Sequence, residues 1–123
     1  MCAIFGIVGV SNLNLVKEIS KIQIFRGPDH QGFYTDKNFL TIGNNRLSVI
    51  DAKNGNQPIF SSDKRYVIVY NGCIYNFNEI KDYLLSKNIK FFTNCDTEVI
   101  VNSFMYFGTK CFNYFDGMWS MAI

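Results

Sequence analysis

The first nine residues constrain the fold more than any other stretch of the chain. A cysteine directly follows Met1, and an apolar run from Ala3 to Val8 leads to Gly9. Such a run predicts a buried strand, which would place the start of the chain at the edge of a sheet. Because the cysteine side chain is small, we expect it not to block removal of Met1. The sequence therefore predicts a sheet protein whose N-terminus becomes Cys2.

Removal of Met1 would give Cys2 a free α-amino group beside its thiol. An α-amine titrates at about pH 7.7 and an ordinary thiol at about pH 8.5. One residue would then carry both a nucleophile and a base of suitable pKa, and a terminal amine can serve as the base of its own nucleophile. The alternative interpretation is that a cysteine stands second by chance and has no catalytic role.

Composition indicates one globular domain. The chain has 123 residues, of which 48% are hydrophobic and 18% are charged, and this is enough for a domain with a real core. A net charge of +2 favours neither a nucleic-acid partner nor an acidic substrate. No apolar run reaches the length of a membrane span, and the start lacks the pattern of a secretory signal. We therefore expect a cytoplasmic protein with no membrane partner.

The cysteines and the histidine form no metal-binding pattern. The cysteines are Cys2, Cys73, Cys95 and Cys111, and no pair of them has C-x-x-C spacing. The one histidine is His30. We expect no metal site, because zinc ligands usually occur as closely spaced pairs. In a chain without an export signal we also expect reduced thiols rather than disulfides.

A helix and a polar heptapeptide follow the first predicted strand. Leu15, Ile19 and Ile22 recur at helical spacing within residues 11–25. The heptapeptide at residues 26–32 contains Gly-Pro, which predicts the end of the helix. This heptapeptide is either a plain turn or a loop that borders a pocket.

Two strands are predicted at residues 39–43 and 47–51, with Arg46 between them. Arg46 would be either a solvated turn residue or an anion ligand, because its forked guanidinium suits a carboxylate. A polar loop at residues 52–56 contains an Asn-Gly turn pair and precedes Gln57.

The clearest strand is at residues 66–70, where five β-branched or aromatic residues predict burial on both faces. It leads directly into Asn71 and Gly72. This pair is either a hairpin turn or an oxyanion site formed by the Asn amide and the Gly backbone N–H. The hairpin interpretation is weakened because no strand returns at once. Residues 76–88 instead predict a helix, with Asn76 as the N-cap of a capping box.

The last part of the chain predicts two more elements of each kind. A short strand or extended segment at residues 89–93 precedes a helix at residues 96–107, which ends at Gly108. Asp96 is either the N-cap of that helix or a carboxylate that faces a pocket and holds an ammonium group. A short helical segment and a final apolar strand at residues 118–123 follow, and this strand would leave a sheet edge open.

Several motifs, taken together, resemble those of one enzyme family. They are Met-Cys-Ala-Ile-Phe-Gly-Ile-Val-Gly at the start, Arg-Gly-Pro-Asp at 26–29, Asn-Arg-Leu-Ser-Val-Ile-Asp at 45–51, Gln-Pro at 57–58, Tyr-Asn-Gly-x-Ile-Tyr-Asn at 70–76, Asp-Thr-Glu at 96–98 and Phe-Asp-Gly-Met-Trp-Ser-Met-Ala-Ile at 115–123. In this order and spacing they are similar to the class II glutamine amidotransferases, which are N-terminal nucleophile hydrolases. Pro28 and Asp29 are similar to the asparagine synthetase branch of that family.

The resemblance implies an α+β fold, a four-layer αββα sandwich of the N-terminal nucleophile hydrolase type that is incomplete at its C-terminus. Residues 1–123 would be the N-terminal portion of the glutaminase domain, and the synthetase domain would be absent. Without the later strands we expect the isolated chain to have an open edge, to be aggregation-prone and to hydrolyse glutamine poorly.

The implied reaction converts glutamine and water into glutamate and ammonia. The residues that match the family's catalytic positions are Cys2 as nucleophile and Asn71 and Gly72 as oxyanion hole. Those that match substrate-binding positions are Arg46, Leu47, Ser48, Val49, Ile50, Asn71, Gly72, Cys73 and Asp96. The chemistry agrees, since a zwitterion with a carboxamide tail needs a cation, an anion, a nucleophile and an oxyanion hole.

The resemblance also implies partners. L-Glutamine would be the substrate, and a synthetase domain, in the same longer chain or separate, would use the ammonia to make asparagine from aspartate. ATP and Mg are expected only in that synthetase domain, and no cofactor is expected in this chain, which has no Gly-rich phosphate loop. We expect no nucleic-acid partner and leave a homodimer open.

Cys73 departs from the family's usual sequence, which has Glu after Asn-Gly. If that Glu contributes mainly through its backbone, Cys73 is tolerated. If the Glu side chain orders the pocket, turnover is lower here.

Two other functions are alternatives to an active glutaminase. One is a truncated, catalytically silent relic or interaction module that retains the glutamine pocket. The other is an amidase acting on a different amide. Arg46 and Asp96 together argue against the amidase, because a cation and an anion match the two charges of an α-amino acid.

Overall fold

The computed structural model describes residues 2–123. Met1, and with it the prediction of its removal, lies outside the described residues. The elements are β1 (Ala3–Val8), α1 (Leu13–Ile22), β2 (His30–Thr35), β3 (Leu40–Arg46), β4 (Ile59–Phe60), β5 (Val67–Ile74), α2 (Phe77–Ser86), α3 (Asp96–Phe107) and β6 (Gly117–Ala122), with short 3₁₀ helices at Ile24–Arg26 and Gly108–Tyr114.

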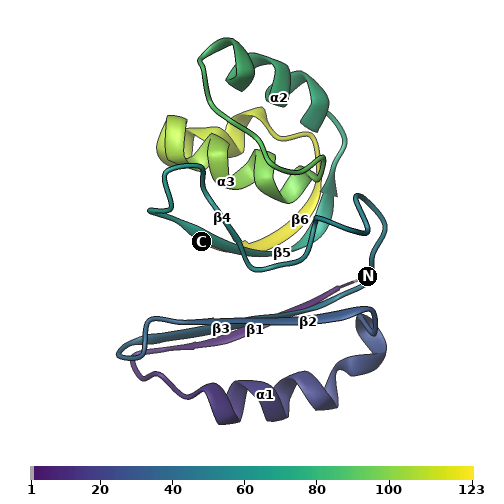
Figure 1. Ribbon diagram of the computed structural model, residues 1–123, viewed down its shortest axis with the longest axis vertical. Helices are drawn as coiled ribbons and strands as arrows, with labels where there is room; N and C mark the ends of the chain where they lie inside the picture. The colour runs from purple at the N-terminus through teal and green to yellow at the C-terminus, as the bar shows by residue number, and fades with distance from the viewer. Residues whose placement is uncertain (1) are drawn as a thin grey trace.

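The strands form two three-stranded antiparallel sheets, with strand orders β1-β3-β2 and β4-β5-β6. Figure 1 shows the two sheets one above the other, with α1 along the outer side of the first sheet and α2 and α3 on the outer side of the second. The chain is therefore a mixed α/β protein with two antiparallel sheets and helices. β6 is an edge strand within the described part of the chain, as its apolar sequence predicted.

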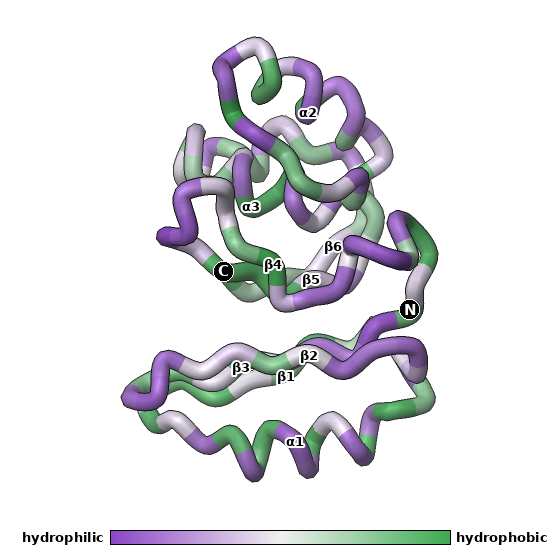
Figure 2. Tube along the Cα trace, viewed as in Figure 1, coloured by the Kyte–Doolittle hydropathy of each residue, from purple (hydrophilic) through white to green (hydrophobic). Residues whose placement is uncertain are grey.

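Two apolar clusters hold these layers together, and β5 contributes to both. Val67 and Val69 pack with Ile42 of β3 in one cluster, while Ile68 packs with Ile100 of α3 in the other. Ile68 and Val69 are 0% and 1% exposed, so burial on both faces of this strand is confirmed. Figure 2 shows hydrophobic residues at β4 and β5 of the second sheet, whereas hydrophobic and hydrophilic positions are mixed along the strands of the first sheet.

β3 corrects the prediction of two strands with Arg46 between them. It is one strand, Leu40–Arg46, and residues 47–51 form an irregular loop. Asn44 and Asn45 lie inside the strand and are fully buried. The Asn44 amide donates to the carbonyls of Ala3 and Tyr70 at 3.3 Å each, and the Asn45 amide donates to the Ser20 carbonyl at 2.8 Å. The usual preference of Asn for turns is overridden because these amides find buried acceptors.

β5 also extends further than predicted. It runs to Ile74, so Asn71 and Gly72 lie within the strand instead of after it, and they do not form a hairpin turn. The reason is β6, which pairs with this part of β5 and places Gly72 opposite Trp119. A Cβ atom at position 72 would lie 2.3 Å from the Met118 carbonyl oxygen, so glycine permits the close approach of the two strands.

The predicted helices are present, with two corrections at their N-termini. Asn76 is the N-cap of α2 by position, but its side chain makes no capping bond and instead bonds the backbone of Tyr114 and Asp116. Cys95 is the N-cap of α3, so Asp96 is its first helical residue and not its cap. Residues 89–93 form no strand. Within residues 2–123, no helix is both long and apolar enough to cross a bilayer.

Candidate active site

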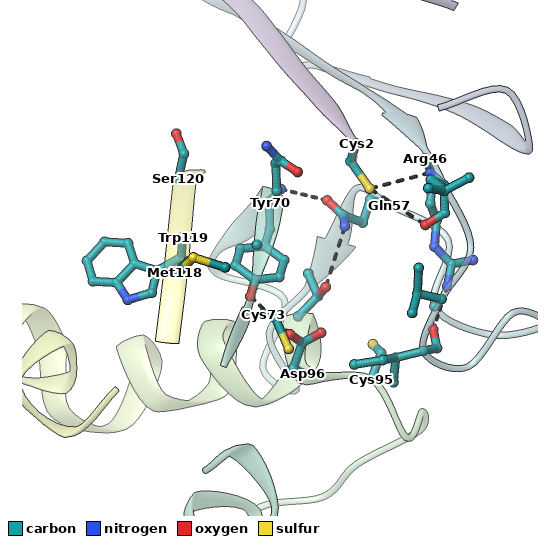
Figure 3. A pocket seen from close by; sticks show the side chains of 17 residues that line it. Cys2, Arg46, Gln57, Tyr70, Cys73, Cys95, Asp96, Met118, Trp119 and Ser120 are labelled. Atoms are coloured by element: carbon teal, nitrogen blue, oxygen red, sulfur yellow. Dashed lines mark hydrogen bonds between the residues drawn. The ribbon is translucent and has the colours of Figure 1, made fainter. Parts of the chain in front are cut away.

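A cavity of about 430 Å³ opens where the start of β1, the end of β3, the middle of β5, the start of α3 and β6 meet (Figure 3). It is lined by Cys2, Arg46, Leu47, Val49, Ile50, Gly55, Gln57, Tyr70, Asn71, Gly72, Cys73, Cys95, Asp96, Thr97, Met118, Trp119 and Ser120. Every site residue predicted from the sequence is in this set except Ser48. The fold thus gathers side chains that are far apart in the sequence around one space.

Cys2 is held by two other segments of the chain. Its Sγ accepts a hydrogen bond from the Leu47 backbone N–H at 3.4 Å, and its carbonyl accepts two from the Arg26 guanidinium, each at 3.3 Å. The thiol lies 3.8 Å from the Leu47 carbonyl oxygen. These contacts fix the position of the Cys2 sulfur at the cavity.

The heptapeptide at residues 26–32 is only partly a loop, because residues 30–32 belong to β2, and residues 26–29 contact the end of β3. Asp29 donates its N–H to the Arg46 carbonyl at 3.0 Å and accepts the Ser48 N–H at 2.7 Å. A Cβ atom at Gly27 would lie 2.2 Å from the Asn45 carbonyl oxygen, so the loop runs closely against the strand. Residues 26–29 therefore fix the position of the pocket wall without lining it. The backbone N–H of Ser48 takes part in this contact through its hydrogen bond to Asp29.

The buried Arg46 side chain forms hydrogen bonds to the loop at residues 50–56, which follows it in the chain. It is 4% exposed, which excludes the solvated turn residue. Its Nη1 donates to the Ala52 carbonyl and to Asn56 Oδ1, at 3.2 and 3.0 Å. Its Nη2 donates to the Ile50 and Asp51 carbonyls at 2.7 and 2.9 Å. Arg46 keeps its positive charge at the cavity wall while its Nη atoms shape the loop at residues 50–56.

The backbone of β5 directs a row of N–H groups toward the cavity. The Tyr70 N–H donates to Gln57 Oε1 at 2.6 Å, and the Ile74 N–H donates to Asp96 Oδ2 at 3.2 Å. Both N–H groups point away from β6, because the backbone hydrogen bonds between β5 and β6 are made by the residues that alternate with Tyr70 and Ile74 along the strand. The Gly72 N–H lies midway between them in this alternation, so it points to the same side. The strand therefore presents a backbone donor beside the Asn71 side chain.

Asp96 is a buried carboxyl at the cavity wall. It is 4% exposed, and its Oδ2 accepts the Tyr70 hydroxyl at 3.0 Å as well as the Ile74 N–H. Among residues 2–123 the only ion pairs are Lys21 with Glu18 and Arg65 with Asp63, so Asp96 forms none. Burial raises the pKa of Asp96, and the hydrogen bonds from Ile74 and Tyr70 partly oppose that rise. A cationic ligand would supply the missing charge.

The other thiols have weak acidity. Burial and the neighbouring Asp96 raise the pKa of the Cys73 thiol, which is half-buried in the same cavity. Burial raises the pKa of Cys95, and raises that of Cys111 to about 11. These three thiols therefore stay protonated near neutral pH, and a protonated thiol is a poor nucleophile.

Several residues that line or support the cavity were not predicted from the sequence. Gln57 bridges two elements, since it accepts the Tyr70 N–H and lies 3.5 Å from Thr97 Oγ1. Arg26 and Tyr70 belong to recognisable motifs, but their contacts with Cys2 and Asp96 depend on strand pairing and could not be read from those motifs. Within the described chain, no cluster of three His, Cys, Asp or Glu side chains is placed to hold a metal ion.

The family is decided by comparison with known proteins. Residues 1–123, the whole chain, match the family model described as a glutamine amidotransferase domain. The chain belongs to this glutamine amidotransferase family. The cavity of this amidotransferase domain is lined by a cysteine, Cys2, an arginine, Arg46, and a buried acidic residue, Asp96.

The curated relatives are named glutamine-hydrolysing asparagine synthetases. Asparagine synthetase 1 of Bacillus subtilis strain 168 is 34% identical over 128 residues, covering 96% of this chain and 20% of the relative. Asparagine synthetase 1 of Arabidopsis thaliana is 36% identical over 129 residues, covering 100% of this chain and 21% of the relative. The nodule asparagine synthetase of Pisum sativum is 33% identical over 129 residues. The amidotransferase domain thus spans about a fifth of the length of these relatives.

Proposed function

We propose that this domain hydrolyses L-glutamine to glutamate and ammonia, with Cys2 as the nucleophile. The observation that carries the proposal is the single cavity that brings together Cys2, Asn71, Gly72, Arg46 and Asp96. Each group answers one part of glutamine: the sulfur and the amide donors face a carboxamide, and the two charged side chains match the α-carboxylate and the α-ammonium.

The fold supports the same proposal at a finer level. We propose that the layers seen in Figure 1 belong to a four-layer αββα sandwich of the N-terminal nucleophile hydrolase type, of which residues 1–123 form the N-terminal portion. The position of Cys2 directly before β1 supports this, because the nucleophile is then also the chain terminus after Met1 is removed.

Glutamine would bind with its α-amino acid end between Arg46 and Asp96. The positive charge of Arg46 faces the α-carboxylate, and the Nε–H is the guanidinium donor not engaged by the loop at residues 50–56. The uncompensated carboxylate of Asp96 faces the α-ammonium. Leu47, Val49 and Ile50 form the wall beside the substrate, and their apolar surface excludes water from the reacting carboxamide.

In the reaction, the Cys2 thiol gives its proton to the α-amine of the same residue, and the sulfur attacks the carboxamide carbon. The Leu47 N–H stabilises the thiolate. Negative charge then develops on the carboxamide oxygen, which the Gly72 N–H and the Asn71 amide receive. The protonated α-amine gives its proton to the carboxamide nitrogen, which leaves as ammonia when the C–N bond breaks and the thioester forms. The amine then takes a proton from the water that cleaves the thioester and returns it to the departing Cys2 sulfur.

Replacing Asn71 with alanine should lower kcat by about a hundredfold to a thousandfold, because one oxyanion donor is lost. The measurement is the rate of glutamate release at saturating L-glutamine. Asn78→Ala is the matched control, since Asn78 is exposed on α2 and outside the cavity. Equal kcat values for Asn71→Ala and the unsubstituted domain would contradict the proposed oxyanion site.

Replacing Asp96 with asparagine should weaken L-glutamine binding by about a hundredfold while making the domain more stable at neutral and alkaline pH. Because folding raises the pKa of Asp96, its stability contribution is full below its ordinary pKa and is lost as pH rises through the folded-state pKa. Asparagine has no ionisable group, so the stability of the Asp96→Asn variant does not fall with pH for this reason.

Thermal unfolding of both proteins between about pH 4.5 and about pH 8 tests this prediction. The melting temperature of Asp96→Asn should exceed that of the unsubstituted domain by an amount that grows with pH. Asp82→Asn, on the exposed face of α2, should show no such trend. A difference that is constant with pH, or unchanged glutamine affinity, would show that Asp96 is not a buried ammonium ligand.

We propose further that the ammonia is used by an ATP-dependent synthetase domain, in the same longer chain or separate, to make asparagine from aspartate. The names of the curated relatives support this proposal. ATP and Mg would then be required only by that synthetase domain. The small net charge of +2 gives no support for a nucleic-acid partner, the cytoplasmic location stays a prediction, and a homodimer stays open.

The proposed function is tested by incubating the purified chain with L-glutamine and measuring glutamate and ammonia. We expect equal amounts of the two products, with D-glutamine and L-asparagine as controls that release neither. Binding of L-glutamine without turnover would instead support the catalytically silent module that retains a glutamine pocket. Absence of both binding and turnover would overturn the proposal.

A further inference from the structure

The Tyr70 side chain is a buried polar group beside the cavity that the proposed reaction does not use. It is 2% exposed, and each of its polar atoms has a partner. Its N–H donates to Gln57, its carbonyl accepts from Asn44 at 3.3 Å, and its hydroxyl donates to Asp96 at 3.0 Å. The ring is therefore held in one place, and the hydroxyl is aimed at Asp96 (Figure 3).

The two β5 donors that reach Asp96 bind the same oxygen. Oδ2 accepts both the Tyr70 hydroxyl and the Ile74 N–H, so neither β5 donor occupies Oδ1, while the Thr97 N–H at the start of α3 also favours the charged carboxylate. A carboxylate held by two donors on one oxygen cannot rotate freely, and donors to its charged form favour ionisation.

We propose that Tyr70 is a positioning residue for substrate binding: its hydroxyl turns Asp96 so that Oδ1 meets the α-ammonium of L-glutamine, and keeps Asp96 ionised in a buried place. The inference rests on the proposed function, because it takes L-glutamine as the ligand. It assigns Tyr70 no part in the bond-breaking steps.

Burial raises the pKa of Asp96, and the Ile74 N–H followed by the Tyr70 hydroxyl opposes that rise, so Tyr70 supplies the side-chain donor that a substitution can remove. The titratable groups beside Asp96 are Tyr70 and Cys73 of β5, Cys2 before β1, Arg46 of β3, and Cys95 and Glu98 near the start of α3. Arg46 is the cation among them, and its Nη atoms are engaged by the loop at residues 50–56. The Glu98 carboxylate accepts hydrogen bonds from the Phe92 and Thr93 N–H groups, so it holds the loop between α2 and α3.

The Tyr70 hydroxyl stays a donor across the useful pH range, because burial and the neighbouring Asp96 carboxylate raise its pKa. Removing the hydroxyl should raise the pKa of Asp96 further, since one donor to the charged form is lost. At a given pH, less Asp96 would be ionised, and L-glutamine would bind less tightly. This effect is largest at low pH and shrinks once the pH exceeds both pKa values.

The experiment measures L-glutamine affinity in the full chain carrying Cys2→Ala, which prevents turnover, with and without Tyr70→Phe. Trp119 is the only tryptophan and lines the cavity, so its fluorescence reports binding. We expect Tyr70→Phe to weaken binding by about tenfold near pH 6 and by less near pH 8.5. Tyr66→Phe is the matched control. Within residues 2–123 the Tyr66 hydroxyl forms no hydrogen bond, and the Tyr66 ring packs on Phe104.

A glutamine analogue that lacks the α-amine separates positioning from general disruption of the pocket. This analogue makes no contact with Asp96, so its affinity should be the same with and without Tyr70→Phe. Equal weakening of L-glutamine and the analogue, or no weakening of either, would overturn the inference. In the hydrolysing domain, Tyr70→Phe should raise KM and leave kcat nearly unchanged.

Carbon NMR titration of the Asp96 carboxyl group gives a readout that needs no ligand. We expect a higher pKa for Asp96 in Tyr70→Phe than in the parent, and an unchanged pKa in Tyr66→Phe. An unchanged Asp96 pKa in Tyr70→Phe would overturn the inference even if glutamine binds. If the Cys2→Ala parent fails to bind L-glutamine at any pH, the proposed function fails, whereas the NMR titration still decides the coupling of Tyr70 to Asp96.

Discussion

Replacing Cys2 with alanine should abolish glutamine hydrolysis, lowering kcat by about four orders of magnitude or more. The thioester cannot form without the sulfur, and the two other thiols that line the cavity, Cys73 and Cys95, have pKa values raised by burial and by Asp96. L-Glutamine should still bind, because the groups proposed to hold its charged ends are unchanged. The measurement is glutamate release during long incubation at saturating L-glutamine.

Cys111→Ala is the matched control for this substitution. Cys111 is a buried thiol near the C-terminal end of α3, outside the cavity, and its removal should leave turnover close to that of the unsubstituted domain. Melting curves of both variants show whether each is folded. Turnover by a folded Cys2→Ala chain would contradict the assignment of the nucleophile.

Retaining Met1 should lower turnover by about a hundredfold to ten-thousandfold, which is the range that general acid–base catalysis contributes. A peptide bond between Met1 and Cys2 converts the α-amine into an amide, and an amide nitrogen cannot accept the thiol proton. The test compares two preparations, with and without Met1, whose state is read by intact mass. Equal turnover of the two preparations would rule out the terminal amine as the base.

Apolar patterns predicted the buried framework of this domain well. The run at residues 3–8 is β1, residues 67–70 of the strand predicted at 66–70 form the start of β5, and the helix at residues 96–107 is α3 with its end at Gly108. The prediction of a strand at residues 3–8 is confirmed but its burial is not, because in β1 only Ala3 is buried and Val8 is 70% exposed. β5 and α3 are predictable because each buries a nearly continuous run of residues, and Gly108 has the positive φ of 60° that favours glycine.

Polar residues that are buried by tertiary contacts misled the sequence analysis. Asn44 and Asn45 suggested a turn, yet they lie inside β3. There the carbonyl of Ala3 in β1 and that of Ser20 in α1 accept hydrogen bonds from their side-chain amides. Asn71 and Gly72 suggested the end of a strand, yet β6 extends the pairing past them. Turn propensity describes an isolated segment, and here strands distant in sequence supply the missing partners.

The members of the candidate site were predictable, but their contacts were not. Motifs drew attention to Cys2, Arg46 and Asp96, and the fold places all three at one cavity. The contact of Arg26 with the Cys2 carbonyl and that of Tyr70 with Asp96 require the register of the strands. Residue types alone therefore indicated the chemistry of the site, and its supporting hydrogen bonds came only from the structure.

The most direct test of Cys2 as the nucleophile of a glutamine site is peptide mapping after reaction with a diazo-ketone analogue of glutamine. We expect a single adduct, on Cys2, and we expect excess L-glutamine to prevent its formation. Cys73, Cys95 and Cys111 should be unmodified, because burial raises the pKa of each thiol. Preferential modification of Cys73, or labelling of Cys2 that L-glutamine does not prevent, would contradict the proposed site.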